Sequence, residues 1–377
     1  MLMNAAVLHE QGLPHPFSDS EPFQIEQVRL DPPGPGEVLV EVRAAGLCHS
    51  DLSVLEGLRA RPLPVVGGHE GAGIVRATGQ GVTGFAEGDH VVVTVAGCGR
   101  CRICVAGRPS ICQAVAGARA EGVLATGARR LHLQDGSPLN HYSGLSVFAE
   151  YAVLASQSLV KISPDVPFEV AALFGCAVVT GAGAVYNTAR VPPGSKVAVI
   201  GLGGVGLAAV MSAREAGASE IVAIDVLPSK FALAGAVGAT HCVDARDPFA
   251  VEHVRDLTQG GADYVFEVSG SIDALGLAQK IAFRGGEVIG VGIGRSDRQF
   301  SVEHLPWVCE ERVLRGSFMG GGVPHRDIPK YVALYLSGRL PVDQLQSEQI
   351  TFQELNVAFD KLHNGLAIRQ VLVPHCV

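Results

Sequence analysis

The stretch KVAVIGLGGVGLAAV (residues 196–210) decides the fold of the central part of the chain. An apolar run typical of a buried strand leads into a glycine-rich turn, and a helical pattern follows the turn. In this context the glycines allow a tight turn and a close backbone approach, and the helix N-terminus attracts a pyrophosphate. The turn therefore predicts a dinucleotide site, and glycines that serve packing alone are the alternative. The residues assigned to this site are Gly201, Leu202, Gly203, Gly204, Val205 and Gly206.

The next predicted strand, EIVAID (220–225), ends in the acidic residue Asp225. A carboxylate at this offset from the glycines accepts hydrogen bonds from the hydroxyls of the adenosine ribose. It also repels a 2′-phosphate by charge, so the sequence favours NAD over NADP.

Strands alternate with helices throughout residues 178–320. After EIVAID come a helix from Pro228, the strand HCVDA, a helix around 250–258, the strand ADYVFEVSG, another helix and the strand GEVIGVGI. Apolar strands that alternate with amphipathic helices predict a doubly wound parallel sheet of the α/β class.

The two ends of the chain have a different texture. Up to about residue 160, short alternating segments such as EVLVEVRAAG and DHVVVTVAG lie between turns rich in Gly and Pro, which predicts an irregular antiparallel β domain. From about residue 321 the mixed texture suits a segment that rejoins this first domain. A chain of 377 residues is long enough for two domains.

Composition excludes several classes of protein. Hydrophobic residues make up 47% and charged residues 18%, which predicts a large buried core and no disorder. The net charge of −8, without a basic block, argues against a nucleic-acid partner. The apolar stretches 170–189 and 197–213 contain several glycines, so we expect buried core and no membrane span. The first residues lack a secretory pattern, which predicts a cytoplasmic protein.

Four of the nine cysteines lie in one short segment, CGRCRICVAGRPSIC (98–112). A disulfide framework is not expected, because the cysteine number is odd and the chain is large. Four thiolates on a loop that can curl around an ion suit a closed structural zinc site. An iron–sulfur cluster and chance spacing are the alternatives. The predicted ligands are Cys98, Cys101, Cys104 and Cys112.

A third group of residues is dispersed along the chain. GLCHSD supplies Cys48, GGHEG supplies His69 and LFGCAVVTG supplies Cys176. Two thiolates and one imidazole would hold Zn²⁺ and leave one coordination position for water or substrate, as in a catalytic zinc site. Taken singly, each residue is more often a buried cysteine or a core histidine.

Together, GHEGAGIV, the cysteine lobe 98–112, GLGGVG with its downstream Asp, and GLCHSD resemble the zinc-dependent medium-chain alcohol dehydrogenases of the dimeric, long-loop type. The resemblance covers essentially the whole chain in the same order. It implies a GroES-like, irregular β-barrel catalytic domain formed by residues 1–177 and 321–377, and a Rossmann domain formed by residues 178–320. It also implies a cleft between the domains that holds NAD and the catalytic zinc.

The resemblance assigns roles around that zinc. Cys48, His69 and Cys176 match the catalytic ligands. Glu70 matches a residue that either binds the zinc transiently or contacts the residues that bind it. Asp51 matches the carboxylate that orients the zinc-bound histidine, and Ser50 matches the hydroxyl that takes the substrate proton. In well-known members a histidine three positions later completes the proton relay. Ser53 stands there in this chain, so either Ser53 or water would complete it.

Further residues fall where the family contacts the cofactor. By resemblance, three of them match contacts to the NAD phosphates and ribose, namely His49, Lys230 and Arg369, and Thr180 matches a contact to the nicotinamide. The cofactor contacts assigned outside the glycine turn are His49, Thr180, Asp225, Lys230, Val268, Val291, Ile293, Phe318 and Arg369.

Three functions compete. The first is a zinc- and NAD-dependent dehydrogenase that interconverts primary alcohols and aldehydes by hydride transfer to nicotinamide C4. The second is S-(hydroxymethyl)glutathione (formaldehyde) dehydrogenase, which shares the scaffold. Its members carry an Arg four residues after the last lobe cysteine, where this chain has Ala116, and Arg119 is out of register. The third is a non-catalytic binding or structural relative.

The substrate pocket departs from the family pattern. A Phe commonly stands three or four residues before the first lobe cysteine, whereas this chain has Thr94 and Val95. The missing ring predicts room for benzylic, allylic or medium-chain alcohols. The alternative is that Leu145, Phe148, Ile293 or the long loop refills the space.

The long loop also bears on assembly. Residues 113–147 resemble the extended loop of the dimeric family members. We therefore expect a homodimer formed by edge pairing of two Rossmann sheets near residues 295–318, with a small-molecule alcohol or aldehyde as the other partner.

Overall fold

The stretch 196–210 forms the strand, turn and helix that the sequence predicts. Strand β11 (Lys196–Ile200) ends at Gly201, and helix α7 (Gly204–Glu215) begins three residues later. Gly217, where the sequence ends this helix, follows it with a φ of 86°. Most residues avoid this backbone conformation, and glycine accepts it without cost, so Gly217 stops the helix.

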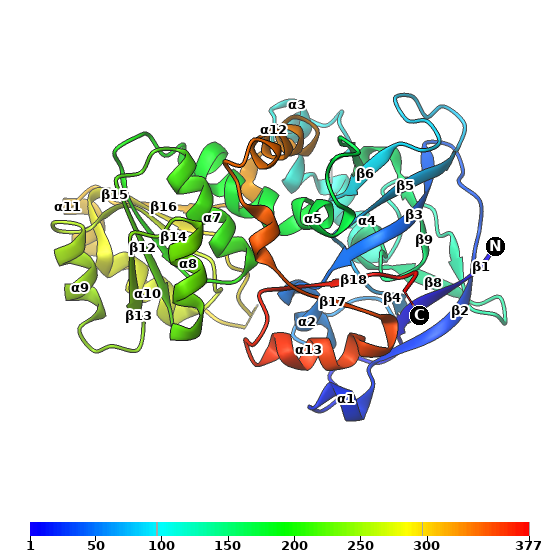
Figure 1. Cartoon of the computed structure of the whole chain (residues 1–377), viewed down its shortest axis with the longest axis horizontal. Helices are drawn as coiled ribbons and strands as arrows, with labels where there is room; N and C mark the ends of the chain where they lie inside the picture. The colour runs from blue at the N-terminus through cyan, green and yellow to red at the C-terminus, as the bar shows by residue number, and fades with distance from the viewer. Residues whose placement is uncertain (96, 296, 377) are drawn as a thin grey trace. The chain divides into compact units, whose positions relative to one another are not determined.

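The computed structural model describes residues 1–95, 97–295 and 297–376, and the chain divides into two units (Figure 1). The first unit comprises Met1–Cys176, Val323–Ala333 and Gln346–Val377. The second unit comprises Ala177–Gly322 and Leu334–Leu345.

A parallel sheet forms the centre of the second unit. In the described residues its strand order is β13-β12-β11-β14-β15-β16, so the chain starts in the middle and winds outward in both directions. This order is that of a doubly wound dinucleotide-binding sheet, and it confirms the predicted fold class. The other strands are β12 (Glu220–Asp225), β13 (His241–Asp244), β14 (Ala262–Glu267), β15 (Ala282–Gly290) and β16 (Val313–Gly316).

Helices pack in two pairs against this sheet. α7 contacts α8, and α9 contacts α10. Apolar side chains at alternate strand positions, such as Ala198 with Ile200 and Val222 with Ile224, form one core with α9 and α10. The helices and short turns of this unit are α6 (Val179–Gly183), η5 (Ala184–Ala189), η6 (Pro228–Lys230), α8 (Phe231–Val237), α9 (Ala250–Leu257), α10 (Ile272–Ile281), α11 (His304–Cys309), η7 (Met319–Gly321) and η8 (Val342–Leu345).

The first unit contains a closed barrel and a larger sheet within the described ranges. The barrel has the order β1-β2-β7-β8-β4, and alternate residues of β1 (Met3, Ala5 and Val7) belong to its core. The second sheet has the order β10-β6-β5-β3-β18-β17, and β9 also pairs with β3. The strands are β1 (Leu2–Leu8), β2 (Phe23–Leu30), β3 (Glu37–Gly46), β4 (Val65–Val66), β5 (Gly71–Thr78), β6 (His90–Val93), β7 (Leu131–His132), β8 (Pro138–His141), β9 (Tyr151–Ala155), β10 (Leu159–Lys161), β17 (Gln346–Ile350) and β18 (Arg369–Leu372).

Short helices connect the strands of the first unit. The longest wholly within its described residues have nine residues, which fits a domain organised by its sheets. α12 (Pro324–Leu336) starts in the first unit and ends in the second. The others are α1 (Phe17–Ser20), α2 (His49–Leu55), α3 (Arg102–Val105), η1 (Pro109–Ile111), α4 (Gln113–Glu121), η2 (Tyr142–Gly144), η3 (Ser156–Ser158), α5 (Phe168–Leu173), η9 (Phe352–Glu354) and α13 (Leu355–His363); η4 (Phe174–Val178) follows α5.

One segment differs from the domain boundaries assigned by sequence. The sequence gives all of residues 321–377 to the first domain, whereas Leu334–Leu345, together with Gly321 and Gly322, belongs to the second unit. Leu340 and Val342 are fully buried, and η8 contacts α7. Apolar contact with the parallel-sheet unit therefore accounts for the difference.

One helical segment in the described part of the chain, Phe168–Ala189, is long and apolar enough to cross a membrane. In its most apolar window 83% of the residues are buried inside the protein, as is typical of a core helix. The segment includes the stretch 170–189, which the sequence predicts to be core.

Candidate functional site

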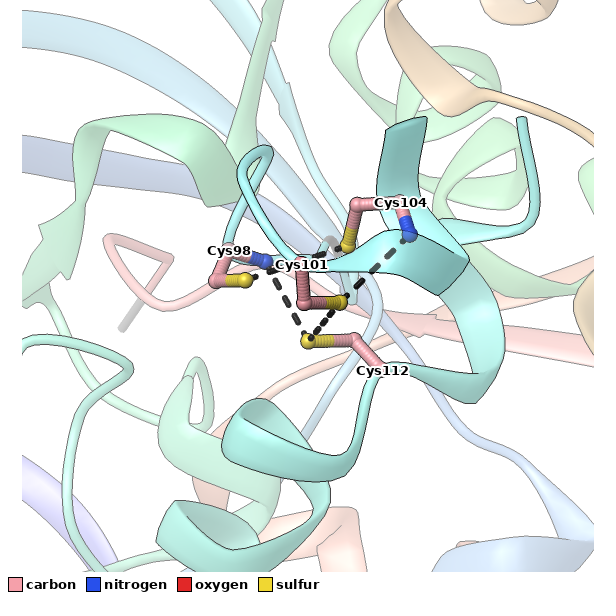
Figure 2. A group of neighbouring side chains, drawn as sticks. All are labelled: Cys98, Cys101, Cys104 and Cys112. Carbon is pink, nitrogen blue, oxygen red and sulfur yellow. Dashed lines mark hydrogen bonds between the residues drawn. The ribbon is translucent and has the colours of Figure 1, made fainter. Parts of the chain in front are cut away.

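The four clustered cysteines converge around one point (Figure 2). Their Sγ atoms all lie within 4.8 Å of one another. The Sγ–Sγ distances are 4.0 Å for Cys98–Cys104 and 3.9 Å for Cys101–Cys112. Four sulfurs at tetrahedral corners, each about 2.3 Å from Zn²⁺, would lie about 3.8 Å apart. The spacing therefore fits a single zinc ion, whereas a multi-iron cluster would hold its thiolates farther apart.

The local backbone prepares these thiols for a cation. The N–H groups of Cys98 and Cys104 donate to the Sγ atoms of Cys112 (3.4 Å) and Cys101 (3.5 Å). Burial raises the pKa of Cys112, but backbone N–H groups of Val115 and Cys98 outweigh burial and lower it to about 6. Burial instead raises the pKa of the Cys104 thiol to about 12, so the backbone favours the thiolate form at only part of the lobe.

Cys48, His69 and Cys176 form a second cluster, although they lie far apart in the sequence. Their ligand atoms lie within 4.8 Å of one another, and all three residues are buried. Cys48 follows strand β3, and His69 precedes β5. Because Ala45 of β3 pairs with Gly71 of β5, the sheet register brings the first two ligands together.

Asp51 fixes the geometry of two of these ligands. Its Oδ1 lies 2.9 Å from Nδ1 of His69, and its Oδ2 accepts a hydrogen bond of 3.1 Å from the backbone N–H of Cys48. With Nδ1–H donating to the carboxylate, Nε2 of His69 keeps its lone pair for a metal. The carboxylate thus holds the imidazole and the start of α2 in one arrangement.

The third ligand, Cys176, lies in the π-helical turn η4. Such single turns occur frequently at functional sites, because they redirect side chains out of the regular helix. A Cβ on Gly175 would lie 2.3 Å from the carbonyl oxygen of Val93, so only glycine allows this close approach. The Thr94 hydroxyl also donates to the Gly175 carbonyl at 2.7 Å. These two contacts fix the turn beside the other ligands.

The electrostatics of the cluster favour cation binding. A hydrogen bond with Cys176 holds the pKa of the Cys48 thiol well below its usual range and raises that of Cys176. This hydrogen bond therefore favours the thiolate form at Cys48 over that at Cys176. Two thiolates, one imidazole and an open fourth position match a catalytic zinc.

A buried ion pair lies behind the ligands. Arg369 Nη1 lies 3.0 Å from Oε1 of Glu70 and donates to the carbonyl of Leu47 at 2.7 Å. Burial raises the pKa of Glu70 to about 7, although Arg369 opposes the rise. The sequence assigns Arg369 to cofactor contacts, and the structure pairs its buried guanidinium with Glu70. Gly46 makes room for this pair, because a Cβ there would lie 2.5 Å from Oε1 of Glu70.

Tyr142 is a site residue that sequence reasoning missed. Its hydroxyl donates to the Ser50 carbonyl at 2.9 Å, and its ring meets the His69 ring edge-on at 5.6 Å between centroids. Tyr142 therefore holds the turn that carries the predicted proton acceptor. Nothing in its local sequence marks it, because it lies in the short turn η2 after β8, where the sequence contains no motif.

Three glycines of the dinucleotide turn differ in how far the fold requires them. Gly201 has a φ of 99°, which few other residues adopt. A Cβ on Gly206 would lie 1.8 Å from the Gly201 carbonyl oxygen, so Gly206 is required for close packing of helix on strand. A Cβ on Gly203 would meet no atom within 4 Å. The protein itself does not require this glycine, which leaves its backbone open to a ligand.

Asp225 stands at the end of β12, beside this turn. Its Oδ2 accepts a hydrogen bond of 2.6 Å from the N–H of Leu202, and Oδ1 accepts one of 2.9 Å from Leu227. Lys230 lies 3.2 Å from Oδ2. Lys230 Nζ also donates to Oδ1 at 3.4 Å. A carboxylate has about four acceptor positions, so a hydroxyl ligand would replace one of these contacts, such as that of Lys230.

The other predicted cofactor residues fall into three groups. Val268, Val291 and Phe318 follow the carboxyl ends of β14, β15 and β16, the edge of an open α/β sheet where ligands bind. Ile293 lies two residues beyond Val291 and is half exposed. The remaining predicted contacts are Thr180, His49 and Arg369. The hydroxyl of Thr180 donates to the sulfur of Met319. His49 is the first residue of α2, and both His49 and Arg369 belong to the first unit.

The predicted pocket residues of the first unit are all buried. Val95 is 6% exposed and Leu145 is 1% exposed. Thr94 is also buried, and its hydroxyl donates to the carbonyl of Gly175. Phe148 is fully enclosed and packs against Phe23, with ring centroids 5.8 Å apart. The structure thus gives Thr94 and Phe148 supporting contacts within the fold.

His141, next to Tyr142, predicts a pH dependence of stability. It is buried, its Nε2 accepts from the N–H of Arg130, and its Nδ1 has no hydrogen-bond partner among the described residues. Burial lowers its pKa from 6.5 to about 3. Below pH 6.5, His141 therefore binds a proton in the unfolded chain but stays neutral in the folded chain. The free energy of unfolding consequently decreases as the pH falls towards 3.

His141→Gln keeps an acceptor for Arg130 and removes this titration. We expect the free energy of unfolding of the variant to fall less steeply below pH 6.5, by up to roughly 1.4 kcal/mol per pH unit. Urea unfolding at a series of pH values measures the slope. The exposed His253→Gln is the control, and identical slopes for wild type and His141→Gln would contradict the assignment.

Two family descriptions match the sequence. Residues 34–164 match the alcohol dehydrogenase GroES-like domain, and residues 204–337 match the zinc-binding dehydrogenase domain. The two matches contain the cysteine lobe and most of the parallel sheet, respectively.

Known proteins resemble the chain along almost its whole length. It is 39% identical over 362 residues to S-(hydroxymethyl)glutathione dehydrogenase of Escherichia coli O1:K1. This match covers 94% of this chain and 97% of the relative. A zinc-binding-domain alcohol dehydrogenase protein from Burkholderia ambifaria is 36% identical, with a TM-score of 0.94 and full coverage of both chains. Benzyl alcohol dehydrogenase from Acinetobacter calcoaceticus is 32% identical, with a TM-score of 0.92 and 99% coverage of both.

Proposed function

The chain belongs to the zinc-dependent medium-chain alcohol dehydrogenase family, as its sequence motifs predict, and from this premise we propose that it oxidises primary alcohols with NAD. The observation that carries the proposal is the buried cluster of Cys48, His69 and Cys176, which leaves a metal one open position. Retention of this cluster speaks against a non-catalytic relative.

The residues of the site have distinct tasks in this reaction. When bound, zinc supplies the Lewis acid that lowers the pKa of the alcohol, and NAD supplies the hydride acceptor. Asp51 keeps Nε2 of His69 available as a ligand. The hydroxyl of Ser50 takes the alcohol proton, and Tyr142 positions Ser50 through its carbonyl. Ser53 or water passes the proton outward.

Two features support NAD and two zinc ions per chain. The buried carboxylate of Asp225 at the end of β12 would bind ribose hydroxyls and repel a 2′-phosphate. The four-cysteine lobe is closed, and the dispersed trio has an open position, so each suits a different zinc.

The proposed substrates are benzylic, allylic or medium-chain primary alcohols. Thr94 and Val95 stand where an aromatic ring narrows the pocket of many relatives. Each additional buried CH₂ of substrate contributes about 0.8 kcal/mol of favourable transfer. A solved relative that acts on benzyl alcohol, at 32% identity, is consistent with this choice.

S-(hydroxymethyl)glutathione is the second candidate substrate, because the curated relative named for it is 39% identical. Burial lowers the pKa of Arg119, and the nearby charges of Arg61 and Arg59 lower it further. These three arginines form a positive group in the first unit that could meet a carboxylate. Ala116 still lacks the guanidinium that the glutathione-dependent members carry in this register.

One set of kinetic measurements separates the candidates. With NAD, we expect kcat/KM for benzyl or octyl alcohol to exceed that for ethanol at least about tenfold, and NADP to support much slower oxidation. Val95→Phe should shift the preference towards ethanol. S-(hydroxymethyl)glutathione as the best substrate would favour the second candidate. No turnover of S-(hydroxymethyl)glutathione or of any alcohol with either cofactor would rule out both.

We also propose a cytoplasmic homodimer. Strand β16 lies at the sheet edge, and all four of its residues are exposed. Leu305, Trp307 and Val308 of α11 are also exposed large apolar residues. An unpaired edge beside apolar side chains suits pairing with a second copy. Ser296, within the predicted interface 295–318, lies outside the described residues.

A further inference from the structure

Two histidines and a glutamate meet on the surface of the first unit, apart from both zinc clusters. His15 precedes α1, Glu56 is the C-cap residue of α2, and His363 is the last residue of α13. Their ligand atoms lie within 4.8 Å of one another. Three segments distant in the sequence thus present two imidazoles and a carboxylate to one point.

The distances are close to those of a metal site. Oε1 of Glu56 lies 2.8 Å from Nδ1 of His363 and 3.6 Å from Nε2 of His15. Nitrogen and oxygen ligands at about 2.0–2.2 Å from a tetrahedral ion lie roughly 3.3–3.6 Å apart. The His15 and His363 rings stack with their centroids 3.9 Å apart, so both side chains would rotate out of this stacking to reach ligand positions.

A fourth residue orients one imidazole. Oδ1 of Asp360 lies 3.5 Å from Nδ1 of His15, on the ring edge away from the nitrogen that faces Glu56. Asp360 is itself fixed, because it accepts hydrogen bonds from the N–H groups of Phe17 (2.7 Å) and Ser18 (2.8 Å). A carboxylate on the non-ligating nitrogen is a common companion of metal-bound histidine. In this chain Asp51 and His69 form the same pair at the zinc cluster.

We propose that His15, Glu56 and His363 form an accessible third site for a first-row transition-metal ion such as Zn²⁺. Two neutral imidazoles and one carboxylate suit Zn²⁺, whereas Ca²⁺ and Mg²⁺ prefer oxygen ligands throughout. The side chains of His15 and His363 are 34% and 40% exposed, so the ion exchanges with solvent and water completes its coordination.

Occupancy of this site links the chain ends. The ion connects the N-terminal segment to α13 and to the end of α2, the helix whose first turn carries Ser50 and Asp51. Because the ligands converge only in the folded chain, the metal stabilises the fold by mass action. This inference does not rest on the proposed dehydrogenase activity.

Calorimetric titration with ZnCl₂ tests the site in full-length protein that has kept its tightly bound zinc through dialysis. We expect wild type to take up one further Zn²⁺ per chain at neutral pH, and His363→Asn or Glu56→Gln to weaken this binding at least about tenfold. Zinc should also raise the thermal midpoint of wild type and leave that of His363→Asn unchanged.

His9→Asn is the matched control, because His9 forms a comparable exposed pair with Glu26 at 2.6 Å but belongs to no group of metal-ligating side chains among the described residues. The control should bind like wild type. Equal zinc binding by wild type and His363→Asn would overturn the proposal, as would an equal loss in His9→Asn. Unfolding midpoints without added zinc show whether each variant folds, and Glu56→Gln gives a second test from another segment.

Discussion

Replacing Cys48 with alanine is expected to lower kcat for alcohol oxidation at least about 10³-fold, which corresponds to roughly 4 kcal/mol of transition-state stabilisation. The thiolate is one of three ligands of the proposed catalytic zinc, and its charge is stabilised within the buried cluster. Without it, the remaining imidazole and thiol hold the metal weakly. Steady-state kinetics and zinc content per chain measure the loss.

The fold should tolerate this change. One buried sulfur is removed, while Asp51 keeps its contact with His69, so we expect the free energy of unfolding to fall by only about 1–2 kcal/mol. Cys242→Ala is the matched control, since this partly buried cysteine belongs to neither zinc cluster. If Cys48→Ala kept its turnover, the ligand assignment would be wrong.

Cys104→Ala should have the opposite effect to Cys48→Ala. We expect it to lower the stability of the fold more than the rate of alcohol oxidation. A closed zinc site contributes folding energy directly, so we expect the free energy of unfolding to fall by roughly 3 kcal/mol or more, together with soluble yield. Most domains are stable by only about 5–15 kcal/mol, so the loss is a large fraction. Thermal unfolding and metal analysis of the purified variant measure it.

Cys309→Ala provides the comparison, because Cys309 is exposed and lies outside the cysteine lobe. It should match wild type in zinc content and unfolding midpoint. A Cys104→Ala protein that also matches wild type would show that the lobe binds no structural metal.

The features that the sequence predicted well are local. The turn after β11 and the four-cysteine lobe each lie within about fifteen consecutive residues, so the spacing of their residues in the sequence largely determines their geometry. The doubly wound sheet also follows from local patterns, because apolar strands and amphipathic helices alternate along the chain. For Cys48, His69 and Cys176, residue chemistry gave only a weak prediction, which the family resemblance strengthened. The register of β3 and β5, which brings Cys48 and His69 together, is not visible in single residues.

The features that the sequence did not reveal depend on long-range contacts. Tyr142 reaches Ser50 from a loop without periodicity, and Arg369 turns to Glu70 from the far end of the chain. Leu340 and Val342 join the second unit because that unit has apolar surface for them. The positions of these residues depend on packing partners that are distant in the sequence, and no local pattern specifies those partners.

The ion pair between Glu70 and Arg369 also has a consequence for synthesis on the ribosome. Its two residues are separated by 299 positions, and β18, which carries Arg369, pairs with β3 next to Cys48. At about 5–20 residues per second, the ribosome adds Arg369 roughly 15–60 s after Glu70. The nascent first unit therefore lacks its buried guanidinium for this time, and the metal centre reaches its final environment only after Arg369 has been added.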